Sequence, residues 1–186
     1  MRFLRFRTPL VALGIVALLS AGIQVGAAFL SESQLKATFL YNFASFVTWP
    51  QEEARKGQPF RYCVGQRGEV ESSLEQLIRG EVIKGRPLVS HLLIDPAEAD
   101  TCDILFLRMP LSSRSRRFLD RVEGKPVLTV ADSADFVRQG GMIALVRRQR
   151  RVVIRINLSR VEQSGLEVSS LLLDLAEIVD QHRERP

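Results

Sequence analysis

The stretch LKATFLYNFASFVTWP, residues 35–50, places its large apolar side chains at the spacing of an α-helix. At about 100° per residue these side chains fall within an arc of roughly 140°, and the polar side chains lie outside it. Ser31 and Gln34 have the spacing of a capping box, and Pro50 is expected to end the helix. The pattern predicts an amphipathic helix whose core face consists of Leu35, Phe39, Leu40, Phe43, Phe46 and Val47.

Two aromatic residues of this segment lie away from the centre of the apolar arc. Tyr41 falls nearly opposite that centre, and Trp49 falls at its far edge, beside Pro50. Exposed Tyr and Trp side chains are enriched at protein interfaces, which makes both residues candidate partner-binding positions. The alternative is that another part of the fold covers them.

After this helix, short apolar runs alternate with helical patterns. Strands are predicted at 60–64, 87–94, 103–107 and 126–130, and helices at 70–78 and 112–122. Such alternation predicts a largely parallel sheet covered on both faces. Within the 70–78 helix, the side chains predicted to point inward are Leu74, Leu77 and Ile78.

The end of the chain departs from the alternation. Residues 142–146 and 152–157 are close enough to form an antiparallel hairpin, and Ser169 and Ser170 are expected to start a last helix. The fold class predicted is α/β, a three-layer α/β/α sandwich with a mixed, mainly parallel sheet and a C-terminal β-hairpin plus helix. The packed stripe of that helix is predicted to be Val168, Leu171, Leu172, Leu175, Ile178 and Val179.

Residues 1–27 have the layout of a secretory signal peptide. Three Arg side chains precede an apolar run from Leu10 to Leu19, and the segment ends in Val25-Gly26-Ala27. The apolar run is shorter than the ~20 residues that span a bilayer. We expect cleavage after Ala27, which leaves residues 28–186 as one exported domain in the periplasm; an uncleaved membrane anchor is the alternative.

Removal of this leader changes the charge of the chain. The whole sequence carries 26 Lys and Arg against 21 Asp and Glu, but three of the Arg leave with the leader, which lowers the net charge from +5 to +2. A nucleic-acid partner is therefore not expected. The one basic cluster, Arg147 to Arg151, is interpreted as the solvated tip of the hairpin, with contact to an anionic surface as the alternative.

The sequence offers no set of residues for catalysis, a metal or a cofactor. His91 and His182 are the only histidines, and neither has partners suited to a metal site or to general base catalysis. The turn Gly65-Gln66-Arg67-Gly68 has backbone amides placed to hold a phosphate, although its spacing fits no phosphate-binding fingerprint and a plain turn is favoured. A small-ligand-binding protein or hydrolase with a cleft at the strand ends is the alternative function.

Cys63 and Cys102 are the only cysteines, and each lies at or beside a predicted strand. In an oxidising compartment they are expected to form a disulfide if the two strands are neighbours. Such a bond closes a loop of about 40 residues and contributes on the order of 4 kcal/mol by the loop-entropy estimate. Two buried free thiols are the alternative.

Short motifs in a fixed order also carry a resemblance. The first of them are Leu35-Lys36-Ala37, Phe39-Leu40-Tyr41-Asn42-Phe43, Phe46-Val47 and Trp49-Pro50. They continue as Gly85-Arg86-Pro87-Leu88, Cys102-Asp103-Ile104-Leu105-Phe106, Gly124-Lys125-Pro126-Val127-Leu128-Thr129-Val130, Asp132-Ser133, Gly140-Gly141-Met142-Ile143, Ile156-Asn157, Gly165-Leu166 and Ser169-Ser170 with Leu172. Each motif is short, but the ordered set resembles the YfiR family of periplasmic proteins.

The resemblance implies a regulatory binding protein rather than an enzyme. Proteins similar to YfiR are dimeric repressors that bind the periplasmic domain of an inner-membrane diguanylate cyclase, and an OmpA-like lipoprotein can sequester the repressor. The expected partners are therefore such a cyclase or a related sensor kinase, an OmpA-like lipoprotein and a second copy of the chain. Cys63 and Cys102 match one cysteine pair that the family links to redox sensitivity, whereas the second pair of some members is absent here.

Overall fold

The computed structural model describes residues 30–179 except for residues 51 and 150. The predicted signal peptide and its cleavage position lie outside these residues, as does His182. Over the described part of the chain, no helix is long and apolar enough to cross a membrane.

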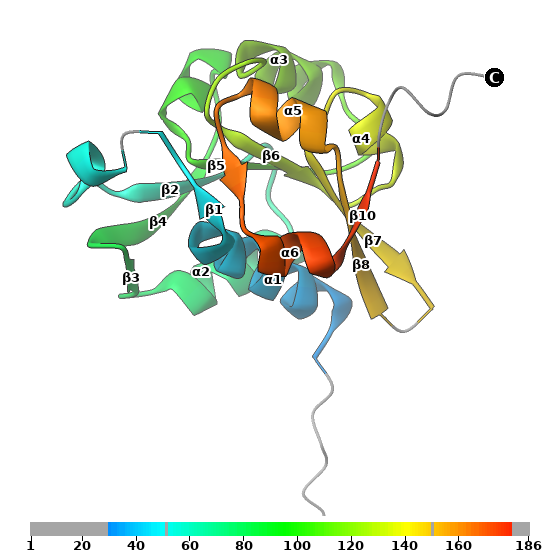
Figure 1. Cartoon of the computed structure of the whole chain (residues 1–186), viewed down its shortest axis with the longest axis horizontal. Helices are drawn as coiled ribbons and strands as arrows, with labels where there is room; N and C mark the ends of the chain where they lie inside the picture. The colour runs from blue at the N-terminus through cyan, green and yellow to red at the C-terminus, as the bar shows by residue number, and fades with distance from the viewer. Residues whose placement is uncertain (1–29, 51, 150, 180–186) are drawn as a thin grey trace, which may run out of the picture.

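An eight-stranded sheet forms the centre of the fold, with the strand order β10-β8-β7-β6-β5-β2-β4-β3 (Figure 1). Neighbouring strands run parallel except in the pairs β3–β4 and β7–β8. The strand bounds are β2 Phe60–Val64, β3 Val82–Ile83, β4 Arg86–Leu92, β5 Ile104–Leu107, β6 Leu128–Ala131, β7 Ile143–Arg148, β8 Arg151–Ile156 and β10 Ala176–Ile178. A separate two-stranded sheet pairs β1, Val47–Thr48, with β9, Glu167–Val168.

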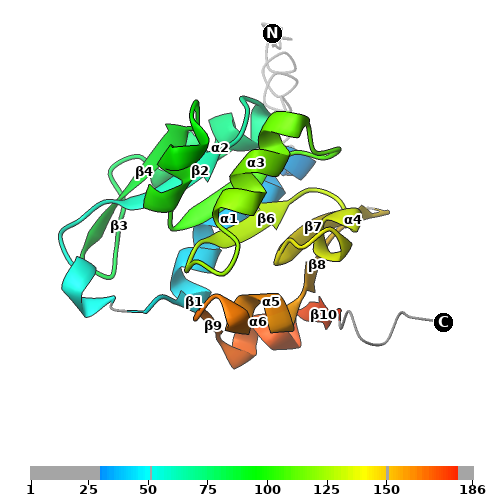
Figure 2. The same ribbon diagram turned by 90° about the horizontal axis from the view of Figure 1, so that it is seen from above.

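Helices cover both faces of the large sheet. Figures 1 and 2 show α1 (Glu32–Phe46) and α2 (Glu69–Ile78) on one side and α3 (Ser113–Arg121) on the other. The remaining helices are α4 Asp135–Arg138, α5 Leu158–Gln163, α6 Ser170–Asp174 and the 3₁₀ turns η1 Glu53–Arg55 and η2 Pro96–Thr101. One apolar core lies between the sheet and the α1 layer, and a second lies against α3. The predicted α/β class with a mixed, mainly parallel sheet is confirmed.

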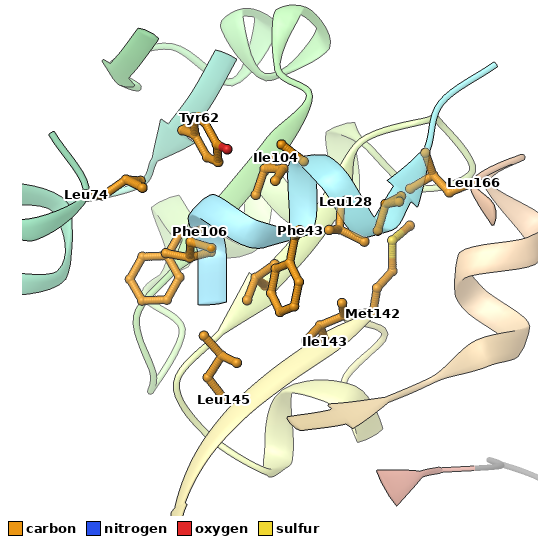
Figure 3. Packing of buried hydrophobic residues seen from close by; sticks show 14 of the residues in the cluster. Phe43, Tyr62, Leu74, Ile104, Phe106, Leu128, Met142, Ile143, Leu145 and Leu166 are labelled. Carbon is orange, nitrogen blue, oxygen red and sulfur yellow. The ribbon is translucent and has the colours of Figure 1, made fainter. Parts of the chain in front are cut away.

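Helix α1 begins as the sequence predicts and ends earlier. Ser31 and Gln34 form the expected capping box, whereas the helix stops at Phe46 because the next two residues pair with β9. Leu40 and Phe43 are buried; Leu35, Phe39 and Phe46 are only half-buried. Figure 3 shows the ring of Phe43 pointing from α1 toward Ile143 and Leu145 of β7.

The predicted last helix is wrong over half of its length. Helix α6 ends at Asp174, and the chain continues as β10, parallel to β8. The β-branched Ile178 and Val179 favour a strand, and three positions of the predicted packed stripe are exposed instead of buried. These are Leu171, Leu175 and Ile178, with exposed fractions of 64%, 68% and 45%.

The β7–β8 hairpin is confirmed, and the basic cluster lies at its tip. The two strands pair antiparallel from Ile143–Ile156 to Arg148–Arg151. Arg147 and Arg148 form ion pairs with Glu32 of α1 and Glu177 of β10. Two of the cluster's Arg side chains are therefore held by carboxylates of the same chain; contact with an anionic surface stays untested.

Two leucines of α2 allow a matched test of this packing. Leu74 is buried against the sheet, whereas Leu77, which the sequence also placed inward, is 42% exposed. We expect Leu74→Ala to lower the free energy of unfolding by about 2–5 kcal/mol because it leaves a cavity, and Leu77→Ala to lower it by about 1 kcal/mol or less. Urea denaturation measures both values, and equal losses would contradict the placement of α2.

Candidate functional site

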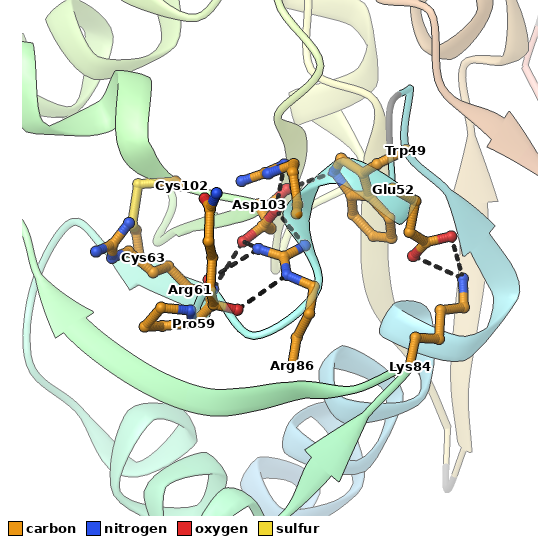
Figure 4. Close-up of polar contacts among 11 residues, drawn as sticks. Trp49, Glu52, Pro59, Arg61, Cys63, Lys84, Arg86, Cys102 and Asp103 are labelled. Atoms are coloured by element: carbon orange, nitrogen blue, oxygen red, sulfur yellow. Dashed lines mark hydrogen bonds and ion pairs between the residues drawn. A yellow bond between two sulfur atoms is a disulfide. The ribbon is translucent and has the colours of Figure 1, made fainter.

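A buried polar cluster is centred on the carboxylate of Asp103, immediately before β5. Its side chain is fully buried, and Arg86 at the start of β4 binds it with two hydrogen bonds, Nη1 to Oδ1 at 3.0 Å and Nη2 to Oδ2 at 2.8 Å (Figure 4). Arg55 reaches Oδ1 at 2.7 Å, and the backbone N–H of Arg61 donates to Oδ2 at 2.8 Å. The carboxylate thus holds together η1, β2, β4 and β5.

The guanidinium of Arg86 uses its other donors on backbone oxygens. Nε donates to the carbonyl of Gln58 at 3.2 Å, and Nη2 donates to that of Pro59 at 2.8 Å. The guanidinium carbon lies 4.9 Å from the centroid of the Phe60 ring, within range of a cation–π interaction. A buried ion pair offsets its desolvation cost only when the remaining polar groups are also bonded, and this pair meets that condition.

Trp49 belongs to the same cluster and is not available to a partner. Its side chain is 1% exposed, its Nε1 donates to the carbonyl oxygen of Asp103 at 3.3 Å, and its ring meets Phe60 edge to face. The interpretation of Trp49 as an exposed contact is wrong. Strand β1 turns the chain back along β9, and this turn places the indole over the beginnings of the parallel strands.

The disulfide between Cys63 and Cys102 is present, as expected from the neighbouring strands. The two Cα atoms are 5.8 Å apart, and both residues are buried in the core on the α3 side. Cys102 directly precedes Asp103, so the covalent link and the ion pair fix the same short segment before β5 (Figure 4).

The position of the cluster indicates a structural role. Open parallel sheets bind ligands beyond the carboxyl ends of their strands, whereas Asp103, Arg86 and Phe60 lie at the amino ends of β5, β4 and β2. Both charged partners are also out of contact with solvent. The arrangement holds the strands in register.

At the carboxyl edge, the turn from Gly65 to Gly68 is a plain turn. The N–H of Gly68 donates to Oε2 of Glu71 at 3.2 Å, and Arg67 lies 3.6 Å from the other carboxylate oxygen. A carboxylate of the chain thus accepts the Gly68 N–H at the start of α2. Gly65 is needed for close packing, because a Cβ there would lie 2.7 Å from Cδ2 of Leu107.

The described residues contain no group of three His, Cys, Asp or Glu side chains that is able to hold a metal ion. His91 lies on β4 with its Nε2 3.5 Å from Oε2 of Glu98. The hydrogen bonds from the N–H groups of Ile94 and Asp95 lower the pKa of that Glu98 carboxyl. The two side chains form a pair at the surface.

Tyr41 is the candidate contact residue that keeps solvent access. Its ring is half-buried on α1, with the hydroxyl 3.5 Å from Oε2 of Glu81. Its carbonyl oxygen accepts a 3.0 Å hydrogen bond from the hydroxyl of Tyr62, whose pKa is raised above the usual range by burial. This bond ties α1 to β2, and Tyr41 itself stays half-buried rather than buried.

A sequence model described as YfiR/HmsC-like matches residues 33–177, from the first turn of α1 into β10. The chain belongs to the YfiR/HmsC-like family. This match covers both large core clusters, the ion-pair cluster, the disulfide and Tyr41. It confirms the resemblance carried by the ordered motifs.

Comparison with solved structures gives more distant similarities. One is the ABC domain in complex with L-Trp from Streptococcus pneumonia, with 9% identity over 65% of this chain and 55% of that one and a TM-score of 0.44. Another is a conserved domain protein from Vibrio cholerae O1 biovar El Tor, with 13% identity over 70% and 60% and a TM-score of 0.43. The chain thus spans less than two thirds of either structure. No curated protein matches the chain in sequence.

Two carboxylates allow a matched test of the buried cluster. Asp103→Asn removes the charge that three groups share and leaves Arg86 buried, so we expect the free energy of unfolding to fall by about 3–5 kcal/mol. Asp100 is paired with Arg121 and Lys125 at the surface, and the hydrogen bonds from these side chains lower its pKa.

The same change at the surface, Asp100→Asn, is expected to cost much less because water screens that pair. Guanidinium denaturation measures both variants. A loss at Asp103 no larger than that at Asp100 would contradict a structural role for the cluster.

Proposed function

We propose that the chain is a periplasmic regulatory protein that represses an inner-membrane diguanylate cyclase, or a related sensor kinase, by binding its periplasmic domain. The family match over residues 33–177 carries this proposal. The family is regulatory rather than catalytic, which agrees with a buried polar cluster that holds strands instead of facing a substrate. Repression would lower cyclic-di-GMP and limit biofilm formation.

Repression of this kind requires only a difference in affinity. If the cyclase exchanges between active and inactive forms, a protein that binds the inactive form more tightly shifts the population toward it. A shift from 1:99 to 99:1 requires about a 10⁴-fold preference, roughly 5.5 kcal/mol. One standard interface with a few well-packed contacts is sufficient for such a preference.

The cellular setting of the proposal is the periplasm. Members of the family are periplasmic, and the arrangement of Arg2 to Ala27 supports export through a cleaved signal peptide. The Cys63–Cys102 disulfide fits an oxidising compartment. An OmpA-like lipoprotein that sequesters the repressor, and a homodimer of the chain, complete the proposed set of partners.

Export and repression are tested together by complementation. Deletion of the gene is expected to raise cellular cyclic-di-GMP and biofilm mass, and the full chain is expected to restore the low level. A matched variant that lacks residues 2–27 keeps the folded domain in the cytoplasm and is expected to fail. If cyclic-di-GMP is unchanged by the deletion, or if the leaderless variant restores it equally, the proposal is wrong.

Tyr41 is the residue that we expect to contact the cyclase. Tyr41→Ala is expected to weaken binding of the cyclase's periplasmic domain by tenfold or more, roughly 1.4 kcal/mol, because buried Tyr side chains often dominate interfaces. Ser45→Ala on the exposed side of the same helix is the control. Calorimetric titration measures both affinities, and an unchanged affinity for Tyr41→Ala would remove Tyr41 from the interface.

A further inference from the structure

The sheet ends at β10 with a row of backbone groups that points away from the fold. In the described residues, β10 pairs with β8 alone, and the N–H of Val179 donates to the carbonyl of Ile156 at 2.8 Å. Because backbone groups of successive strand residues face opposite neighbours, Glu177 also faces β8. The N–H and C=O groups of Ala176 and Ile178 therefore face outward.

Exposed apolar side chains flank this edge. Leu171 of α6, Leu175 and Ile178 are the three most C-terminal of the large exposed hydrophobic residues. Beside them, an open groove of about 680 Å³ runs between the hairpin and β10. Its lining is mostly polar and includes Glu177, with apolar area from Val153, Leu175 and Ala176. An exposed strand edge with neighbouring apolar surface favours pairing with another strand.

The residues that follow this surface in the sequence are nearly all polar. Residues 180–186, DQHRERP, contain only polar and charged side chains apart from a terminal proline. Their side chains offer no apolar area to match the exposed leucines. A partner that matches this surface must supply both a strand edge and apolar side chains.

We propose that a second copy of this chain binds here, with the two β10 strands paired antiparallel across a two-fold axis at Glu177. In this register Ala176 of each copy lies opposite Ile178 of the other, and their outward backbone groups form four hydrogen bonds. The two large sheets become one continuous sheet. The strand edge and the apolar patch can each pair with the same feature on a second copy. Such a self-complementary surface favours a second copy over an unrelated partner.

The charges at the axis are compatible with this pairing. Two Glu177 side chains facing each other would repel if they were unpaired. However, Oε1 of Glu177 lies 2.5 Å from Arg148, and Oε2 lies 3.5 Å from Arg155. Two carboxylates and four guanidinium groups therefore meet at the axis, which leaves the centre of the interface without net repulsion between acids.

Three residues of strand are too few to hold two copies together. Isolated strand pairs are marginal in water, and specific interfaces bury on the order of 1,200–2,000 Å² in total. Leu171 and Leu175 must therefore supply apolar area beside the strand. Both leucines are exposed in the single chain and become buried in the proposed dimer. This assigns a role to leucines that the single chain leaves in solvent.

A cysteine at the axis tests the register directly. Residues at a non-hydrogen-bonded antiparallel pair have Cα atoms about 4.5 Å apart, close enough for a disulfide. Glu177→Cys is expected to form a disulfide-linked dimer under mild oxidation, whereas the matched Glu75→Cys on the exposed surface of α2 is expected to stay largely uncrosslinked. No more crosslinking at residue 177 than at residue 75 would overturn the proposed register.

Light scattering of the mature protein tests the apolar contacts. The wild type is expected to be dimeric, and Leu175→Glu is expected to raise the dimer dissociation constant at least about tenfold because it buries an unpaired charge. Leu77→Glu, at a less exposed leucine on the surface of α2, should leave that constant unchanged. A monomeric wild type, or equal dissociation constants for both variants, would overturn the proposal.

This surface deepens the homodimer expected above but does not depend on cyclase binding. The mass measurement requires only the purified chain, whereas the repressor function is tested through cyclic-di-GMP. If the chain is dimeric but deletion of its gene leaves cyclic-di-GMP unchanged, only the proposed function is wrong. If the chain represses the cyclase as a monomer, only the proposed dimer is wrong.

Discussion

The buried ion pair between Arg86 and Asp103 is the constraint on which the rest of the fold depends. Removing two charges from water is costly, and the chain offsets that cost by bonding both partners to several segments at once. Asp103 also accepts the N–H of Leu128 on its carbonyl, which adds β6 to the strands it connects. Four parallel strands therefore begin at positions set by one carboxylate and its own backbone. The disulfide one residue earlier fixes the same segment covalently.

This arrangement separates stability from function in space. The charged groups of Arg86 and Asp103 are bonded inside the fold, at the amino ends of the strands. At the carboxyl edge, where open parallel sheets bind ligands, Glu71 accepts the N–H of Gly68. The surfaces that we propose for molecular recognition are the Tyr41 side of α1 and the free edge at β10. A protein that acts by binding needs a rigid scaffold with such surfaces, and membership of a regulatory family agrees with this design.

The sequence predicted the central sheet well because buried parallel strands leave a clear signal. The apolar runs at Phe60 and Ile104, and the hairpin around Arg147–Arg151, correspond to observed strands within a few residues. The last segment was misassigned because leucines at three- and four-residue spacing fit a helix as well as a short helix followed by a strand. Only the pairing of β10 with β8, a contact between distant parts of the chain, decides between these interpretations.

The ion-pair cluster was missed for a related reason. Asp103 beside an apolar run and Arg86 before Pro87 are charged residues at strand ends, which usually face solvent. Their partnership depends on β4 and β5 flanking β2, and the sequence order does not reveal that arrangement. Trp49 was ambiguous because helical geometry places it at the edge of the apolar arc, whereas the chain actually leaves the helix at Phe46 and turns the indole inward.

Amide hydrogen exchange of the free protein tests the central role of this cluster most directly. The N–H groups of Arg61 and Leu128 donate to the side chain and the carbonyl of Asp103. If the cluster holds the strand beginnings together, both amides exchange only through global unfolding, with the full free energy of unfolding of the domain. Exchange of either amide through local opening, at a free energy well below the global value, would contradict the account.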